Sequence, residues 1–367
     1  MLIFPNAIRS FVALVFSGVA SAGSYTVSVI LPPSGFTGVN MSCINNSGQT
    51  AGYGVNGTGF AQAFIGSPSG SVTIPFPTGW ATAQSSAINN SGQITGFVSP
   101  ADLSKPFIGA TSGSVTIPLP AGWILAIGLA INSSGQVAGW GSGFTTQAFI
   151  GNTSSSTAIP FPAGSNFTEG YGINDSGQVT GYAGIAATTQ AFIGTAAGSA
   201  VIPLPGGWSS SAGDAINSSG QVAGYGFTGS TYQAFLVTAS GSTVIPLPPG
   251  AVEAQVARGS LNDSGSVVGY SDAGGWIWSA AAGTQLLNTL VPVGWNIQTA
   301  YSISQNGLIL AAGSFDGAPG QYVVLTPAVA TTPAPAAGFL ALAGTLLLLT
   351  WRLLFHRAAR RDRGDPA

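Results

Sequence analysis

Residues 130–140 of this 367-residue chain read AINSSGQVAGW. The apolar start of the stretch predicts the end of one β-strand, and QVAGW predicts the beginning of the next. The NSSG segment between them predicts a tight turn. Asn132 can cap its own turn, and Gly135 can adopt the left-handed backbone conformation that such a hairpin needs. The stretch therefore predicts a β-hairpin.

The same block occurs seven times along the chain. Its first apolar residue stands at Ile44, Ile88, Ile131, Ile173, Ile216, Leu261 and Ile303. The steps between these positions are 44, 43, 42, 43, 45 and 42 residues, and a Gly follows four positions later in every copy. A regular period of this length is typical of repeat proteins, in which each copy forms one structural unit.

Each copy predicts four strands. The hairpin supplies the first two, and a block such as QAFI at 147–150 predicts the third. The fourth is a block such as VTIPLP at 115–120, where Pro suits only the end of an outer strand. Four short strands in each period are typical of a β-propeller blade. We therefore expect an all-β, seven-bladed propeller, with a β-solenoid or stacked sheets as the alternative.

The two ends of the repeat region predict how the ring closes. The seventh copy ends after its third strand, QYVVL at 321–325, and lacks a fourth. The segment YTVSVILPP at 25–33 resembles the missing block. We therefore expect this N-terminal strand to complete the last blade, whereas a linear solenoid would need polar caps at both ends.

The repeated block, followed by a short Ala-Phe strand, resembles the extracellular repeats of the HAF family, named for His-Ala-Phe. The resemblance covers residues 25–327. Gln stands where that name has His in four copies, at Gln62, Gln147, Gln190 and Gln233. The resemblance implies an extracellular location, and it implies no established activity.

Residues 1–22 predict a secretory signal peptide. Arg9 precedes an apolar stretch over 11–19, and the small residues ASA at 20–22 form a cleavage site. The repeat body, residues 23–328, would then be exported.

The C-terminal region predicts a membrane anchor or a sorting tail. A Pro/Ala linker over 329–337 precedes an apolar segment over 338–355 and a basic tail over 356–367. The apolar segment is long enough for a transmembrane helix, and the arginines after it favour a cytoplasmic tail. This ending resembles the PEP-CTERM sorting signal, which implies an exosortase-type processing enzyme and a connection with exopolysaccharide. Ala334 stands where that motif has Glu, so a retained anchor at the cell surface is the alternative to a cleaved, extracellular product.

Composition excludes several classes of protein. Only 5% of residues are charged, and the body between residues 23 and 332 has just two basic residues, Lys105 and Arg258. Nucleic acid is therefore not an expected partner, because a phosphate-binding surface needs clustered Lys and Arg. Cys43 is the only cysteine, so no disulfide can form within the chain, and we expect Cys43 to be a small buried residue.

The body offers little material for catalysis. The only histidine, His356, lies in the C-terminal tail, which excludes a Ser-His-Asp triad or a histidine metal site in the body. Asp175 and Asp263 lie in the repeated turns, which carry too few carboxylates for a calcium loop. We therefore expect no catalytic residue, no metal and no cofactor.

A repeated tryptophan is the one candidate binding feature. Trp80, Trp123, Trp208 and Trp295 each stand eight residues before a repeat Ile, in the connection between two blades. Asp102, Asp272 and Asp316 lie in loops on the same face of the predicted propeller. Indole rings with carboxylates nearby suit sugars, and packing between blades is the alternative role of these tryptophans.

These features together predict an exported, non-enzymatic surface or matrix protein that binds polysaccharide or another extracellular component. A purely structural or protein-adhesion propeller is the alternative. A carbohydrate-active enzyme is less favoured, because it would need two carboxylates facing each other across the substrate. The expected partners are an extracellular polysaccharide or surface protein, and the bacterial membrane through the C-terminal segment.

Overall fold

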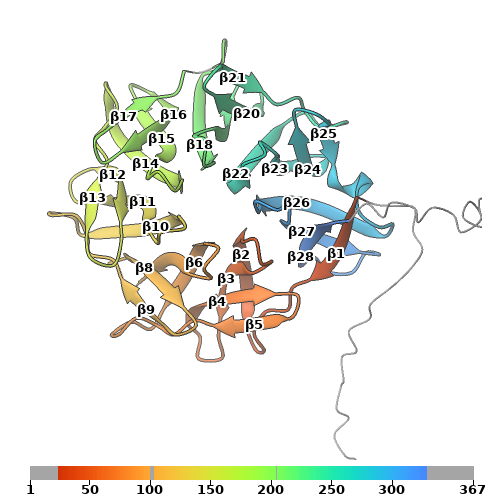
Figure 1. The fold of residues 1–367 in the computed structure, drawn as a ribbon, viewed down its shortest axis with the longest axis horizontal. Helices are drawn as coiled ribbons and strands as arrows, with labels where there is room; N and C mark the ends of the chain where they lie inside the picture. Colours follow the sequence, from red (N-terminus) through yellow and green to blue (C-terminus); the bar gives the residue numbers. More distant parts are fainter. Residues whose placement is uncertain (1–23, 100–102, 204, 329–367) are drawn as a thin grey trace, which may run out of the picture. The chain divides into compact units, whose positions relative to one another are not determined.

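A computed structural model describes residues 24–99, 103–203 and 205–328 of the chain. These residues form seven four-stranded antiparallel sheets arranged as the blades of a ring (Figure 1). Within six blades the strands follow chain order from the centre outward, as in the order β2-β3-β4-β5. The predicted seven-bladed β-propeller is therefore confirmed.

Each blade uses its strands in the same way. The innermost strands are β2 (Thr37–Ile44), β6 (Ala83–Ile88), β10 (Leu125–Ile131), β14 (Ser165–Ile173), β18 (Ser210–Ile216), β22 (Ala254–Leu261) and β26 (Trp295–Ile303). The second strands are β3 (Thr50–Val55), β7 (Ile94–Val98), β11 (Val137–Ser142), β15 (Val179–Ile185), β19 (Val222–Phe227), β23 (Val267–Ser271) and β27 (Ile309–Phe315). The third strands are β4 (Ala61–Ser67), β8 (Lys105–Ala110), β12 (Thr146–Gly151), β16 (Thr188–Thr195), β20 (Tyr232–Thr238), β24 (Gly274–Ser279) and β28 (Gln321–Pro327).

The outer strands are shorter than the sequence predicted. They are β5 (Gly70–Thr73), β9 (Gly113–Thr116), β13 (Ser156–Ala158), β17 (Gly198–Val201), β21 (Gly241–Val244) and β25 (Gly283–Leu286), the last followed by a 3-10 turn, η1 (Leu287–Thr289). The prediction that the Ile-Pro-Leu-Pro segments belong to these strands is wrong. Pro118, for example, has no N–H to continue the ladder, so β9 ends at Thr116 and Ile117 makes one last backbone bond to Pro106.

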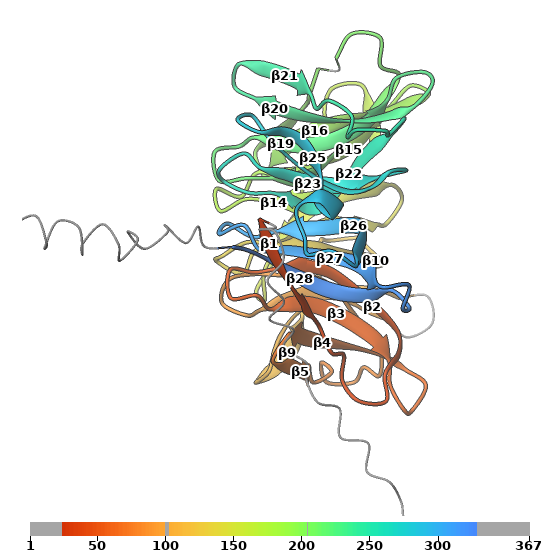
Figure 2. The ribbon, with the colours of Figure 1, turned by 90° about the vertical axis from the view of Figure 1, so that its right-hand side faces the viewer.

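The N-terminal strand closes the ring, as predicted. β1 (Tyr25–Val29) pairs antiparallel with β28, in a register that runs from Tyr25 opposite Pro327 to Val29 opposite Val323. Figures 1 and 2 show β1 beside β28 at the outer edge of the last blade. The first and last blade-forming segments of the chain therefore share one sheet, and no blade is left with three strands.

The core lies between the blades. The third strand of most blades contributes one fully buried aromatic side chain: Phe64, Phe107, Phe149, Phe192, Phe235 and Trp276. Cys43 is also buried, as predicted, and burial raises the pKa of its thiol to about 11. Because every blade buries apolar residues against its neighbours, the stability of one blade depends on the next.

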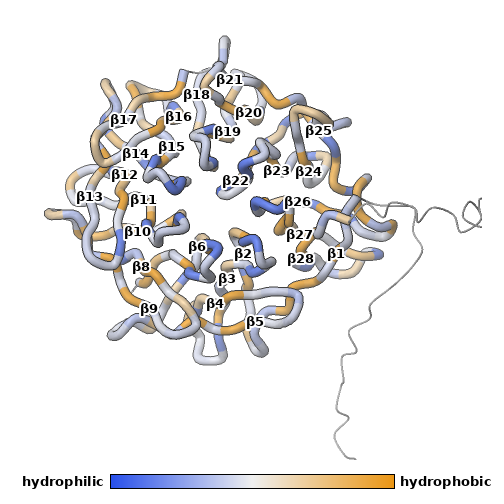
Figure 3. Tube along the Cα trace, viewed as in Figure 1, coloured by the Kyte–Doolittle hydropathy of each residue, from blue (hydrophilic) through white to orange (hydrophobic). Residues whose placement is uncertain are grey.

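Hydrogen bonds also join neighbouring blades near the centre of the ring. Asn132 accepts the backbone N–H of Gln136 within its own turn, and its Nδ2 donates to the carbonyl of Asn174 in the next blade at 3.1 Å. Equivalent side chain–carbonyl bonds start from Asn45, Asn89, Asn174, Asn217 and Asn262. We call these six residues the asparagine ring. Figure 3 shows hydrophilic segments around the centre of the propeller, and the predicted role of the Asn segments as turns is confirmed.

The predicted signal peptide, linker, apolar segment and basic tail lie outside the described residues. Among the residues that are described, no helix is long and apolar enough to cross a membrane.

Candidate functional site in the central channel

A ring of β-bulges shapes the central channel. Each innermost strand loses register with its neighbour shortly before the repeat Ile or Leu. In six blades a single residue bulges from the ladder: Ser42, Ser86, Leu129, Tyr171, Asp214 and Tyr301. Bulges re-aim side chains and are common beside functional sites. The chemistry of the channel therefore depends on which residue each blade places at this position.

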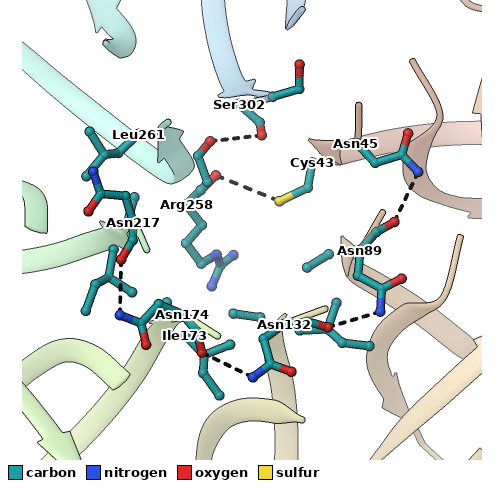
Figure 4. A pocket seen from close by; sticks show the side chains of 18 of the residues that line it. Cys43, Asn45, Asn89, Asn132, Ile173, Asn174, Asn217, Arg258, Leu261 and Ser302 are labelled. Atoms are coloured by element: carbon teal, nitrogen blue, oxygen red, sulfur yellow. Dashed lines mark hydrogen bonds between the residues drawn. The ribbon is translucent and has the colours of Figure 1, made fainter. Parts of the chain in front are cut away.

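The sixth blade departs from this pattern. In β22 the register shifts between Val256 and Leu261, so the four residues 257–260 have no partner in the ladder. Gly259 takes a left-handed conformation, with φ of 73°, which a side chain would disfavour. The side chain of Arg258 enters the channel at this break (Figure 4). The longest break in the pairing of the innermost strands thus contains Arg258.

Side chains of the seventh and first blades contact the backbone of this break. The hydroxyl of Ser302 donates to the carbonyl of Gly259 at 3.0 Å, and the thiol of Cys43 lies 3.9 Å from the carbonyl of Arg258 (Figure 4). No hydrogen bond from the guanidinium to another drawn residue is marked in Figure 4. The backbone of Arg258 is therefore fixed, while its charged group stays available in the channel.

Two cavities meet at Arg258. The first, which we call the turn-side cavity, has a volume of about 290 Å³ and is lined by the asparagine turns (Figure 4). The second, the bulge-side cavity, has a volume of about 420 Å³. Its lining consists of Asn40, Met41, Ser42, Tyr53, Gln84, Ser85, Ser86, Phe97, Ile127, Leu129, Ala257, Arg258 and Tyr301. Arg258 is the only charged side chain among the described residues that line the bulge-side cavity. The volume of this cavity suits a small organic ligand.

Tyr171, from β14, lies close to Arg258, and its hydroxyl is bonded to Glu169 of the same strand. The guanidinium carbon of Arg258 is 5.5 Å from the centre of the Tyr171 ring, a cation–π contact. The Tyr171 hydroxyl donates to Glu169 Oε2 at 3.0 Å. Burial, followed by the charge of Glu169, raises the pKa of Tyr171, so this hydroxyl stays protonated and keeps donating to the carboxylate.

Asp214, the bulge residue of β18, is a buried carboxyl group. It is only 6% exposed, and its Oδ2 has no hydrogen-bond partner among the described residues. Burial raises the pKa of Asp214 to about 7, and the positive charge of Arg258 limits the rise. An unpartnered polar atom at full burial costs free energy. This cost is smaller when Asp214 is neutral. When Asp214 is ionised, the positive charge of Arg258 stabilises it.

The sequence-predicted tryptophans pack on their own blades. Trp123 meets Phe149 edge-to-face at a centroid distance of 6.1 Å, and Trp208 meets Phe235 at 5.8 Å. A Cβ atom placed on Gly141 would lie 2.5 Å from the Trp123 ring, so that ring covers the backbone of the second strand. The same holds for Trp208 over Gly226.

Trp80 and Trp295 have different neighbours. Trp80 lies 5.9 Å from the ammonium of Lys105, and Trp295 packs against Phe315. All four tryptophans are half-buried. They occupy repeated positions at or just before the innermost strands, but none of them lines either cavity.

The two predicted loop aspartates that the structure describes are exposed. Asp272 is exposed and accepts the backbone N–H groups of Val252 and Glu253, so it fixes a loop. Asp316 is exposed with a positive φ of 46°. Asp102 lies outside the described residues.

Sequence reasoning missed Arg258, Asp214, Glu169 and Tyr171. One signal was present: Arg258 and Asp214 are the single charges within innermost strands that are otherwise uncharged, in the segments QVARGSL and SSAGDAI. A charge inside such a strand must face a polar space or a partner.

No protein-family model and no curated protein matches the chain. Solved structures do match. They include a puromycin hydrolase (TM-score 0.52, 12% identity over 80% of this chain and 54% of that one). A puromycin-hydrolysing peptidase of Mycobacterium tuberculosis matches with a TM-score of 0.53 and 10% identity, over 83% of this chain and 57% of that one. A prolyl endopeptidase matches with a TM-score of 0.50 and 10% identity, over 80% and 51%.

These matches correct the functional expectation. The chain spans about half the length of these structures, which are hydrolases. The prediction of a non-enzymatic surface protein that binds polysaccharide, or that has a structural or adhesive role, is therefore wrong. At 10–12% identity the likeness establishes the propeller fold and not an activity, and the expectation that the chain is no enzyme is left unconfirmed.

Proposed function

We propose that this propeller holds peptides in its central channel, as the substrate-binding part of a peptide-hydrolysing reaction. The observation that carries the proposal is the break in β22, which places one cation in a channel cavity whose other described lining residues are neutral. In a repeat fold, residues that follow the repeat serve packing. A departure that adds a charge to a cavity has no packing benefit and points to a ligand.

The lining of the bulge-side cavity suits a peptide. Asn40 and Gln84 offer amide groups that can pair with both the N–H and the C=O of a peptide backbone. Tyr53, Phe97 and Tyr301 offer aromatic surface for side chains. A mixed lining of this kind binds a flexible polar chain better than a purely apolar ligand.

The similar structures support the reaction class. They are named as puromycin hydrolases and prolyl endopeptidases, and the propeller corresponds to about half of each. The described residues contain no histidine. The proposal therefore gives the propeller the task of holding the substrate, and gives bond cleavage to a separate hydrolase domain or protein.

Equilibrium dialysis of the purified full-length chain against a mixed library of tri- to hexapeptides tests the proposal, with mass spectrometry as the readout. Ser86→Trp fills the bulge-side cavity, because Ser86 is one of its bulge residues. Ser154→Trp is the matched control, because Ser154 is exposed in an outer loop. Circular dichroism shows whether both variants are folded.

We expect the wild-type chain and Ser154→Trp to retain peptides, and folded Ser86→Trp to retain at most about a tenth as much, because steric exclusion removes the site. Equal retention by the two folded variants would place binding outside the channel. Failure of the wild type to retain any peptide would overturn the proposal.

A further inference from the structure

We infer that the channel reads a carboxylate group, the C-terminus of a bound peptide, through Arg258. The inference rests on the proposed function for the source of the carboxylate. It goes further because it names the group that is recognised and the residue that recognises it.

The position of Arg258 suits this role. Cys43 contacts its carbonyl and Ser302 donates to the carbonyl of the next residue, Gly259, while no hydrogen bond to its guanidinium is marked in Figure 4. The ring of Tyr171 supports one side of the guanidinium. A planar guanidinium can then present its N–H groups to both oxygens of a carboxylate, an arrangement that gives strength and direction.

The carboxylate of Glu169, which is bonded to the tyrosine beside Arg258, already has a partner. Glu169 Oε2 accepts the hydroxyl of Tyr171 at 3.0 Å. No ion pair between Arg258 and an acidic side chain is found within 4.0 Å among the described residues. Arg258 thus enters the cavity without a bonded counter-ion.

Asp214 makes carboxylate binding depend on pH. The positive charge of Arg258, from β22, lowers the pKa of Asp214 and so opposes the effect of burial. Burial raises the pKa of Tyr225 of β19 and of Tyr270 of β23, and the charge of Asp214 raises both further. The two tyrosines have raised pKa values and stay neutral near pH 7. When Asp214 is protonated, the charge of Arg258 is available to the ligand; when Asp214 is ionised, it competes. Binding should therefore be coupled to protonation of Asp214.

The test uses two libraries of N-acetylated tripeptides, one with a free C-terminal carboxylate and one with the carboxamide. Retention by the full-length chain is measured by equilibrium dialysis at pH 6 and pH 8. The variants are Arg258→Gln and Asp214→Asn. Lys105→Gln is the matched control, because Lys105 is the other basic residue of the described body and lies by Trp80, away from the cavities.

At pH 6 we expect the acids to bind about tenfold to a hundredfold more tightly than the amides, as is usual when a charge-assisted hydrogen bond is lost. Arg258→Gln should remove this preference, and Lys105→Gln should keep it. Wild-type binding of the acids should be about tenfold weaker at pH 8 than at pH 6. Asp214→Asn should bind the acids with the same affinity at both values.

The possible contrary results separate the two ideas. Equal binding of acids and amides by the wild type would overturn the carboxylate inference and leave peptide binding intact. Retention of neither library would overturn both. Displacement of the bound acids by equimolar acetate would show that any carboxylate suffices, which would overturn the assignment to a peptide C-terminus.

Discussion

The guanidinium of Arg258 lies over the ring of Tyr171 at 5.5 Å, although the two residues belong to blades four and six of the propeller. The fifth blade separates them around the ring. Their contact is possible because the break in β22 lets Arg258 reach across the channel. Two blades that are not adjacent are therefore linked through the space at the centre.

This contact should be measurable as a coupling energy. In a double-mutant cycle of Arg258→Gln with Tyr171→Leu, we expect a coupling of about 1 kcal/mol in the free energy of unfolding, the usual size of a partly exposed cation–π pair. Tyr171→Phe keeps the ring and should keep most of the coupling. Additive effects of Arg258→Gln and Tyr171→Leu in guanidinium denaturation would argue against the contact.

Gly259 should tolerate no side chain. Its φ of 73° disfavours other residues, and a Cβ atom would lie 2.9 Å from Ser302 Oγ. We expect Gly259→Ala to lower the free energy of unfolding by about 3 kcal/mol, from backbone strain plus crowding. Gly283 is the matched control: its φ is 69°, but no atom lies within 4 Å of its added Cβ. Gly283→Ala should cost about 1 kcal/mol, and equal losses would show that crowding at Gly259 is unimportant.

The asparagine ring should contribute to stability through bonds between blades. Asn132→Ala removes the bond to the carbonyl of Asn174, which keeps the backbone N–H of Gly177 as a partner, and it leaves the backbone amide of Gln136 without its partner. We expect a loss of about 3 kcal/mol in urea unfolding, because a bond between blades is lost and a backbone amide of the turn becomes unsatisfied. Asn152 forms a similar turn within one outer loop, bonded to Ser154 and Ser155. Asn152→Ala should therefore cost about 1 kcal/mol or less. A reversed order would mean that the bonds between blades add little.

The closing strand should be sensitive on one face only. Val27 packs against the core of the last blade, whereas its neighbour Thr26 is exposed. We expect Val27→Asp to lower the free energy of unfolding by about 3 kcal/mol, since a charge enters apolar surroundings. Thr26→Asp should change it by about 0.5 kcal/mol or less. Thermal unfolding of both variants checks this, and similar melting temperatures would show that β1 is not packed as described.

Asp214 should make stability fall as pH rises. Its pKa is about 7 in the folded chain and 3.8 as a free group, so the folded state binds the proton more tightly between these values. The unfolding free energy of the wild type should therefore decline from about pH 4 to pH 7 relative to Asp214→Asn, and the difference should level off above pH 7. Urea unfolding at a series of pH values measures this difference. A constant difference across the range would show that Asp214 titrates normally.

The blade count and the closure were predictable because both follow from local patterns. The hairpin turn repeats at a nearly fixed period, and the segment at Tyr25–Val29 resembles the fourth strand that the last copy lacks. These signals report strands and turns, which depend on neighbours in the sequence. The ends of the outer strands were misplaced, because Pro118 and its equivalents allow one more hydrogen bond but not a longer ladder.

The channel site was not predictable in the same way. Whether β22 skips four residues is decided by its pairing with β23 and by support from Ser302 and Cys43 on other blades. The tryptophans show the same limit on prediction, because the sequence shows their spacing but not their packing. Their packing depends on Gly141 and Gly226, which leave room on the second strands.

The pairing of β1 with β28 also decides when the last sheet can form during synthesis. β1 is the first strand of the propeller to be synthesised and β28 is the last, so their sheet cannot form before the rest of the propeller has been made. Contacts between distant parts of a chain form slowly, because a large loop has to close. A chain cut short before β28 would leave β1 and β27 as bare edges that invite aggregation. The propeller can therefore finish folding only in a chain that includes β28.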